Sequence, residues 1–143
     1  MTKRDDFVKI IKPEYTYKGE SLILGTTIFA GKTLWNAHVK TPLKTLNRHE
    51  LIAGTTGTRK TKSISVLSEQ FSSFGIPVLM MDVKGDLGGI AKEGEEKSFI
   101  MDRHAKINIP YNASKFPVEL LALSEQDRLG LRATASEFDP VLF

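Results

Sequence analysis

The spacing of apolar residues between positions 51 and 83 predicts a strand, a helix and a second strand. Residues 51–53 form a short apolar run, and residues 76–83 form a longer one that reads IPVLMMDV. A continuous run of this kind is typical of a strand buried on both faces of a parallel sheet. Between the runs, apolar residues recur at intervals of three, four and three, as on one face of a helix. They are Ile64, Leu67, Phe71 and Phe74.

Glycine and proline mark the ends of these predicted elements. Gly54 follows the first apolar run, and Gly75 and Pro77 come directly after the helical pattern, where they end the helix. A strand, a glycine-rich turn, a helix and a strand within about thirty residues form a βαβ unit. The sequence therefore predicts that the two strands lie parallel in the interior of one sheet.

The start of the chain predicts a charged leader and a hairpin. Residues 1–20 are rich in charged side chains and leave room for at most one short helix. Residues 21–29 and 34–40 are β-like, and the turn that joins them falls at residues 30–33. Both strands of this hairpin precede the predicted βαβ unit.

Downstream of the βαβ unit the pattern is weaker. Residues 84–97 are polar and rich in glycine, which predicts a loop with one short helix. Residues 98–101 and 105–109 are expected to be short strands, and residues 116–123 favour either a strand or the start of a helix. Residues 131–143 carry apolar residues at helical spacing.

Composition limits the class of protein. The chain has 143 residues, of which 41% are hydrophobic and 26% charged, and this is typical of one globular domain. It has no cysteine, which excludes a disulfide framework and a thiolate metal site. The net charge of +3 is compatible with a nucleic-acid partner but too small to argue for one. No apolar run is long enough to cross a bilayer, so we expect no membrane partner and a cytoplasmic location.

The stretch GTTGTRKT, from Gly54 to Thr61, has the spacing of a phosphate-binding loop. Loop amides and the start of the following helix would surround the phosphates, a lysine would reach the β- and γ-phosphates, and the next hydroxyl would ligate Mg²⁺. The residues expected to bind nucleotide are Gly54, Thr55, Thr56, Gly57, Thr58, Arg59, Lys60, Thr61 and Lys62.

Arg59 stands where the loop pattern has glycine, and this leaves two alternatives open. If the side chain points into the phosphate cradle it closes the site, and this is the case that we expect. If it points outward the cradle survives and gains a charge. A strand-to-helix turn with a surface lysine is the alternative to any phosphate loop at this position.

A second candidate, GTTIFAGKT at residues 25–33, contains Gly-Lys-Thr but one residue too many after its first glycine. It lies between two β-like segments and has no amphipathic helix after it. We therefore expect a hairpin turn with an exposed Lys32. The three histidines lie far apart in the sequence and show no metal-ligand spacing.

Three blocks of sequence resemble one family. Residues 43–92 resemble the opening of the ATPase core of HerA-like proteins, in the HerA/FtsK group of P-loop ATPases and its branch often labelled DUF853. LNRH at residues 46–49 and MDVKGDL at residues 81–87 follow the pattern of that branch, and so does LRATASEF at residues 131–138. The resemblance runs from about residue 20 to the end.

The resemblance implies an α/β fold with a partial P-loop NTPase core of the RecA-like kind, built on a parallel sheet. This core is expected over residues 43–143, after the leader and β-hairpin segment of residues 1–42. ATP and Mg²⁺ are the implied cofactors, with Thr61 and Asp82 as the expected metal ligands. Asp82 has an equal alternative as a solvent-exposed residue at the end of a strand. DNA and self-association into a ring are the implied partners.

The implied function is the ATP-binding portion of a HerA-like ATPase or DNA translocase, with a variant Walker A loop and no Walker B region. In relatives the acidic Walker B strand comes later than Phe143, so we expect no ATP hydrolysis by this chain alone. The alternative is a degenerate, non-catalytic fragment or accessory module that keeps the fold without nucleotide turnover. Glu50, Arg59 and Asp139 depart from the family pattern.

Overall fold

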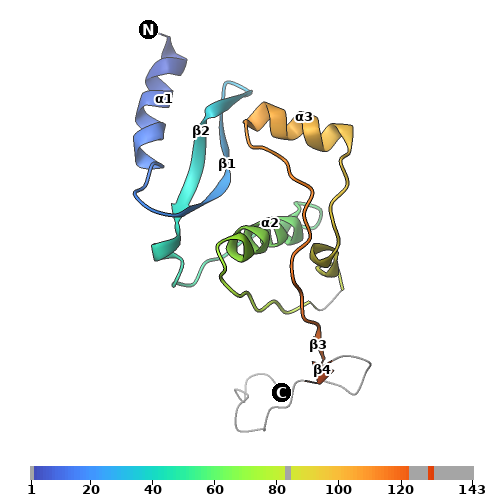
Figure 1. Cartoon of the computed structure of the whole chain (residues 1–143). Coiled ribbons are helices and arrows are strands. Elements are labelled where there is room, and N and C mark those ends of the chain that lie inside the picture. The colour runs from blue at the N-terminus through green and yellow to red at the C-terminus, as the bar shows by residue number, and fades with distance from the viewer. Residues whose placement is uncertain (1, 83–84, 123–128, 131–143) are drawn as a thin grey trace.

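The computed structural model describes residues 2–82, 85–122 and 129–130. Figure 1 shows a central hairpin with α1 on one side and with α2 and α3 on the other. The elements in chain order are α1 (Lys3–Glu14), β1 (Ser21–Phe29), β2 (Lys32–Pro42), the 3₁₀ turn η1 (Leu43–Thr45), α2 (Lys60–Ser73), the 3₁₀ turn η2 (Gly88–Ala91), α3 (Ser98–Ile107), β3 (Leu121–Ala122) and β4 (Leu129–Gly130).

The predicted hairpin is confirmed. Strands β1 and β2 pair antiparallel, and Phe29 faces Lys32 across the two-residue loop. That loop is Ala30-Gly31, and both residues have positive φ, 48° and 74°, as the tightest right-twisted hairpin turns require. Lys32 is exposed, as expected. The Gly-Lys-Thr sequence at this turn therefore belongs to a hairpin and precedes no helix.

A wide bulge interrupts the hairpin. Thr26 faces His38 and Ile28 faces Thr33, so β2 carries more residues than β1 between the two pairs. The Thr26 hydroxyl lies within hydrogen-bond distance of the carbonyl oxygens of Leu34 and Ala37, and the Thr27 hydroxyl donates to Ala37 over 3.2 Å. These bonds hold the carbonyl groups that the bulge removes from the strand ladder.

The most deeply buried apolar side chains of the described residues all belong to the hairpin. Leu22 and Leu34 are fully buried and Ala37 is 1% exposed. On the side of α1, the rings of Phe7 and Phe29 lie 5.0 Å apart. The small core of this part of the chain is therefore formed where α1 and the other helices cover the hairpin.

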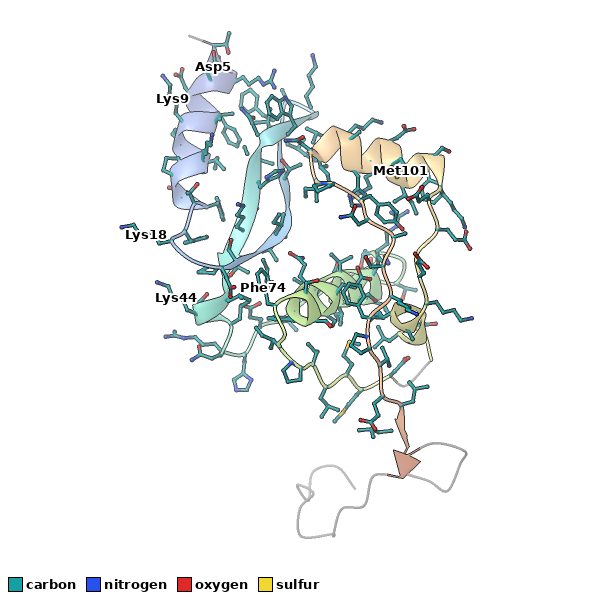
Figure 2. The ribbon with its side chains drawn as sticks, viewed as in Figure 1. Asp5, Lys9, Lys18, Lys44, Phe74 and Met101 are labelled. Carbon is teal, nitrogen blue, oxygen red and sulfur yellow. The ribbon has the colours of Figure 1, made fainter. Side chains whose placement is uncertain are left out.

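Helix α2 begins and ends where the sequence predicts. It starts at Lys60 and stops before Gly75, whose φ of 72° suits a glycine. The amide of Gly75 donates to Ser72 over 2.9 Å, and the amide of Ile76 donates to Phe71 over 3.0 Å. This pair of bonds is a Schellman motif, which satisfies the last carbonyl groups of the helix. Figure 2 shows Phe74 at this end of α2.

The predicted parallel sheet, and with it the RecA-like α/β fold class, is wrong. Residues 51–53 and 76–82 are not strands, and the longer pairing that the structure describes is the antiparallel hairpin. Leu51 is 89% exposed and Leu79 is 77% exposed, where the prediction required burial. A central parallel strand needs a paired strand on each side and cover on both faces. The described residues supply neither to these two apolar runs.

Helix α3 replaces two predicted strands. Residues 98–101 and 105–109 were expected to be strands, but one helix runs through Ser98–Ile107 and ends at Asn108 in the left-handed conformation. The apolar residues of this segment fit a helical period. The short helix expected within residues 84–97 is confirmed as η2.

The rest of the predicted pattern is resolved only in part. Within residues 116–123, β3 is the one described element, and it pairs in parallel with the equally short β4. The helical pattern of residues 131–143 lies outside the described residues. No helix in residues 2–82 and 85–122 is long and apolar enough to cross a bilayer.

Candidate functional site

The loop of residues 54–59 is a compact turn that leads into α2. The amide and the hydroxyl of Thr58 both donate to the carbonyl oxygen of Thr55, over 3.3 and 2.7 Å. Gly57 has a φ of 83°, a conformation that a side chain would strain. A phosphate-binding loop is expected between a strand and a helix. Here a helix follows the loop, but no strand precedes it.

Gly54 requires its lack of a side chain. A Cβ atom at this position would lie 2.5 Å from Oγ1 and 3.3 Å from Cβ of Thr58. The Thr58 hydroxyl is already bonded to Thr55, so it does not move aside without losing that bond. The first glycine of the loop pattern thus has a packing reason here.

Arg59 adopts a left-handed backbone conformation, which favours glycine. Its φ and ψ are 62° and 32°, in the left-handed region, and it is the N-cap residue of α2. A non-glycine residue in this region costs about 1–2 kcal/mol. The residue is exposed to solvent, as are the other residues of the loop from Gly54 to Thr58.

Lys60 folds back over the loop. Its Nζ donates to the carbonyl oxygen of Gly54 over 2.7 Å and to that of Thr55 over 2.8 Å. Two of the three ammonium hydrogens are therefore held by the opening residues of the loop. The lysine of the motif therefore lies against the first residues of the loop.

The start of α2 leaves backbone donors without a partner from the helix itself. Its first bond is from the Ser63 amide to Arg59 over 3.1 Å, and Arg59 supplies no side-chain cap. The amides of the first helical turn, together with the positive end of the helix dipole, favour an anion. No acidic side chain occupies this first turn.

The remaining expected loop residues lie on the surface. Thr61 is exposed, and its carbonyl oxygen accepts the hydroxyl of Ser65 over 3.0 Å. Its own hydroxyl is the group expected to ligate Mg²⁺. Thr55, Thr56 and Lys62 are also exposed. The same helix start therefore carries uncapped helix amides, the Thr61 hydroxyl and three cationic side chains, those of Arg59, Lys60 and Lys62.

Asp82 organises a turn of its own. Its Oδ1 accepts the amides of Gly85 and Asp86 over 2.8 and 3.2 Å, and its Oδ2 accepts the amide of Leu87 over 2.8 Å. Sequence reasoning missed this role, although an aspartate shortly before a glycine, as in Asp-Val-Lys-Gly at residues 82–85, is a turn signal. Among the described residues, no group of three or more His, Asp or Glu side chains is arranged to hold a metal ion.

Two serines are the most buried residues of α2. From the sequence, these serines were expected to be either exposed to solvent or packed against other elements. Ser65 and Ser68 are both 7% exposed, whereas Ile64 and Phe74 on the apolar face are 38% exposed. The Ser68 hydroxyl donates to Ile64 over 2.9 Å and lies 3.1 Å from the sulfur of Met80. Small side chains allow the chain after α2 to approach the helix closely, and bonding within the helix removes the cost of burying their hydroxyl groups.

Comparison with known families identifies the chain. Residues 28–143 match the helicase HerA-like C-terminal family, and the matched range includes β2, the loop and α2. The chain therefore belongs to the helicase HerA-like C-terminal family, as the three blocks of sequence predicted. No curated protein and no solved structure matches the chain.

Proposed function

We propose that the loop of residues 54–62 binds the phosphates of ATP, and that the chain is the ATP-binding portion of a HerA-like ATPase. One observation carries this proposal. The Lys60 ammonium lies across the loop at an uncapped helix start, directly after Arg59, whose backbone is left-handed. The family to which the chain belongs supports the same reading.

Each residue of the loop has its own role in binding the nucleotide. The amides of the first turn of α2 donate to phosphate oxygens, as at other helix N-termini that hold anions. Lys60 exchanges the carbonyl oxygens of Gly54 and Thr55 for the β- and γ-phosphates. Thr61 offers its hydroxyl to Mg²⁺, which neutralises the phosphate charge when it is bound. Arg59 adds a positive charge at the solvent side of the loop.

We assign binding rather than turnover to these residues. Phosphoryl transfer needs a group that orients the attacking water. The loop itself, GTTGTRKTK, contains no carboxylate. A role for Asp82 near the metal remains part of the proposal, although its carboxylate already holds the turn at residues 85–87.

We extend the proposal to the partners that the resemblance implies. The family description names a helicase, a class of protein that acts on nucleic acid, and this supports DNA as the partner. Assembly into a ring rests on the resemblance alone. The net charge of +3 is compatible with DNA. A cytoplasmic setting belongs to the same proposal, supported by a sequence without cysteine.

A second candidate function is an accessory module that keeps the HerA-like sequence but binds no nucleotide. The observation that favours it is again at Lys60, whose ammonium is already bonded to two loop carbonyl oxygens. An ammonium satisfied by its own loop has less to gain from a phosphate than one in solvent. The two candidates therefore differ in whether ATP outcompetes these two bonds.

Titration of the whole chain with a fluorescent ATP analogue and Mg²⁺ distinguishes the two candidates. We expect saturable binding that weakens by about tenfold to a hundredfold in Lys60→Ala, the range for a lost hydrogen bond to a charged group. Lys32→Ala is the matched control, because Lys32 belongs to the Gly-Lys-Thr of the hairpin turn and should leave binding unchanged. No binding by the unmodified chain, or equal binding by Lys60→Ala, would favour the accessory module.

A further inference from the structure

Gln70 joins helix α2 to the hairpin through both ends of its carboxamide. Its Oε1 accepts the backbone N–H of Ile23 over 2.8 Å, and its Nε2 donates to the carbonyl oxygen of Ile23 over 3.0 Å. A side-chain amide that bonds both groups of one residue pairs with it as a neighbouring strand would. In the described part of the chain, no other side-chain hydrogen bond connects α2 with the hairpin.

Ile23 is the right residue of β1 to receive such a partner. It faces Lys40 in β2, but its own N–H and C=O are both directed to Gln70. This is the position in an antiparallel pair whose two backbone groups point away from the partner strand. An unpaired strand edge leaves such groups to water or to another chain. Gln70 satisfies them from within the molecule.

Gln70 also stands on the helix that carries the loop. It lies in the last turn of α2, and Lys60 begins the first turn of the same helix. Helix α2 is a continuous hydrogen-bonded rod between these two points, with its first bond at Ser63. A constraint at its last turn therefore fixes the orientation of its start relative to the hairpin.

We propose that Gln70 is a positioning residue that couples the hairpin to the start of α2, so that the two open and close as one cooperative unit. Loop and hairpin then share one opening equilibrium, and a ligand that stabilises one protects the other. The part of this inference that concerns a ligand rests on the proposed nucleotide function. The coupling between Ile23 and the helix start does not.

Amide hydrogen exchange, read residue by residue by NMR on the whole chain, tests the coupling without a ligand. Gln70→Ala should accelerate exchange of the Ile23 amide by about tenfold, the loss expected for one hydrogen bond. It should also accelerate the Ser63 amide, which closes the first turn of α2. Ser73→Ala is the control, because it removes a side-chain bond to Glu69 within the same helix and should leave both amides unchanged.

The outcomes separate a coupling from a local bond. Acceleration of Ile23 alone would mean that Gln70 holds the hairpin edge without positioning the loop helix, and this overturns the proposal. Unchanged exchange at Ile23, or an equal effect of Ser73→Ala, overturns it as well. If Gln70→Ala fails to fold, Gln70→Glu replaces it. At neutral pH that variant keeps an acceptor for the Ile23 amide and loses the donor, so the expected acceleration is smaller than in Gln70→Ala. Below about pH 4 the protonated carboxyl group supplies a donor again, and the protection of the Ile23 amide should return.

A second arm adds ATP and Mg²⁺ to the same samples. Binding should slow exchange of the Ile23 amide in the unmodified chain but not in Gln70→Ala. Absence of any binding would defeat the proposed nucleotide function, while the ligand-free exchange of Ile23 and Ser63 still decides the coupling. Binding that leaves Ile23 exchange unchanged in the unmodified chain would contradict the coupling itself.

Discussion

The first turns of α1 and α2 differ in how their unpaired backbone N–H groups are satisfied. At α1 the hydroxyl of Thr2 accepts the amide of Asp5, and the Asp5 carboxylate accepts the Thr2 amide over 3.0 Å. This capping box satisfies the helix donors from within the chain. At α2 the N-cap residue is Arg59, which caps nothing, and the first turn contains Lys60 and no acid. The first helix start is closed, and the second is left open to an anion.

An absent cap does not by itself define the second start. Helix α3 also begins without a side-chain cap, at Lys97. Lys97 has extended backbone angles, and its ammonium pairs with Glu95 over 2.8 Å rather than folding over a loop. What distinguishes α2 is the combination of a left-handed residue, a tight turn before it and a lysine bonded to the carbonyl groups of that turn.

A side chain at Gly54, the first glycine of the loop, should have the largest effect on stability and on nucleotide binding. In Gly54→Ala the new Cβ meets the hydroxyl of Thr58, which is held by Thr55, so the turn must rearrange. Overpacking of this kind typically costs about 1–3 kcal/mol, and we expect nucleotide binding to fall with it. Chemical denaturation and the ATP titration measure both. Gly88→Ala is the control, since a Cβ there meets nothing within 4 Å, and equal losses in the two variants would contradict the account.

Removing the cap of α1 should affect stability but not binding. Thr2→Ala deletes the hydroxyl that accepts the Asp5 amide, and losses of this kind cost about 0.5–2 kcal/mol. The cost should appear in the melting of α1 by circular dichroism, whereas the affinity for the ATP analogue should stay the same. A change in affinity would mean that the two helix starts are not independent.

Restoring glycine at residue 59 should stabilise the open start. Arg59→Gly removes the left-handed strain, about 1–2 kcal/mol, and adds the entropy cost of glycine, about 0.5–1 kcal/mol. The expected net gain is therefore below about 1.5 kcal/mol in the free energy of unfolding. Arg59→Ala is the matched control, because it removes the charge and keeps the strain. A gain in Arg59→Ala equal to that in Arg59→Gly would point to charge rather than backbone geometry.

For nucleotide affinity, the same pair of variants decides between the two alternatives for Arg59. If the side chain closes the cradle, both variants bind ATP more tightly than the unmodified chain. If it points outward, as the proposed binding by the unmodified chain requires, neither variant gains affinity by opening the site, and loss of the charge weakens binding slightly. We expect the second result, measured in the same titration.

Acid should loosen the start of α1, which is the smallest effect. The backbone amide of Thr2, and after it the Thr2 hydroxyl, hold the pKa of the Asp5 carboxyl below its usual value. A lowered pKa in the folded state means that the stabilisation is complete above the ordinary value of 3.8 and is lost as the pH falls from there through the lower folded-state pKa. Exchange of the Asp5 amide should therefore accelerate below about pH 4. Asp5→Asn should remove this dependence, and its persistence would assign the effect to another group.

The sequence predicted elements that rest on local chemistry. The hairpin turn at Ala30-Gly31, the start of α2 at Lys60 and its end at Gly75 all follow from residues within a few positions of one another. The turn before α2 also lies where the sequence pattern has its loop, whereas the predicted binding by that loop stays a prediction. The family was recognised from three separate blocks of sequence and not from any single local pattern.

The parallel sheet could not be predicted from the same information. A continuous apolar run states that a segment suits a buried strand, but it does not supply the neighbouring strands that bury it. Residues 76–82 fit the pattern and nevertheless form no strand in the described structure, with Leu79 and Met81 77% and 87% exposed. The role of Gln70 was missed for a related reason, since its partner Ile23 is distant in sequence.

The most direct test of the central claim compares the two helix starts in one experiment. Proton–nitrogen NMR spectra of the whole chain are recorded while ATP and Mg²⁺ are added. The account predicts saturable shifts of the amides of Gly57, Lys60 and Thr61 at the open start, and none at Asp5 in the capped start of α1. Absence of shifts at residues 57–61, or shifts of equal size at both helix starts, would contradict it.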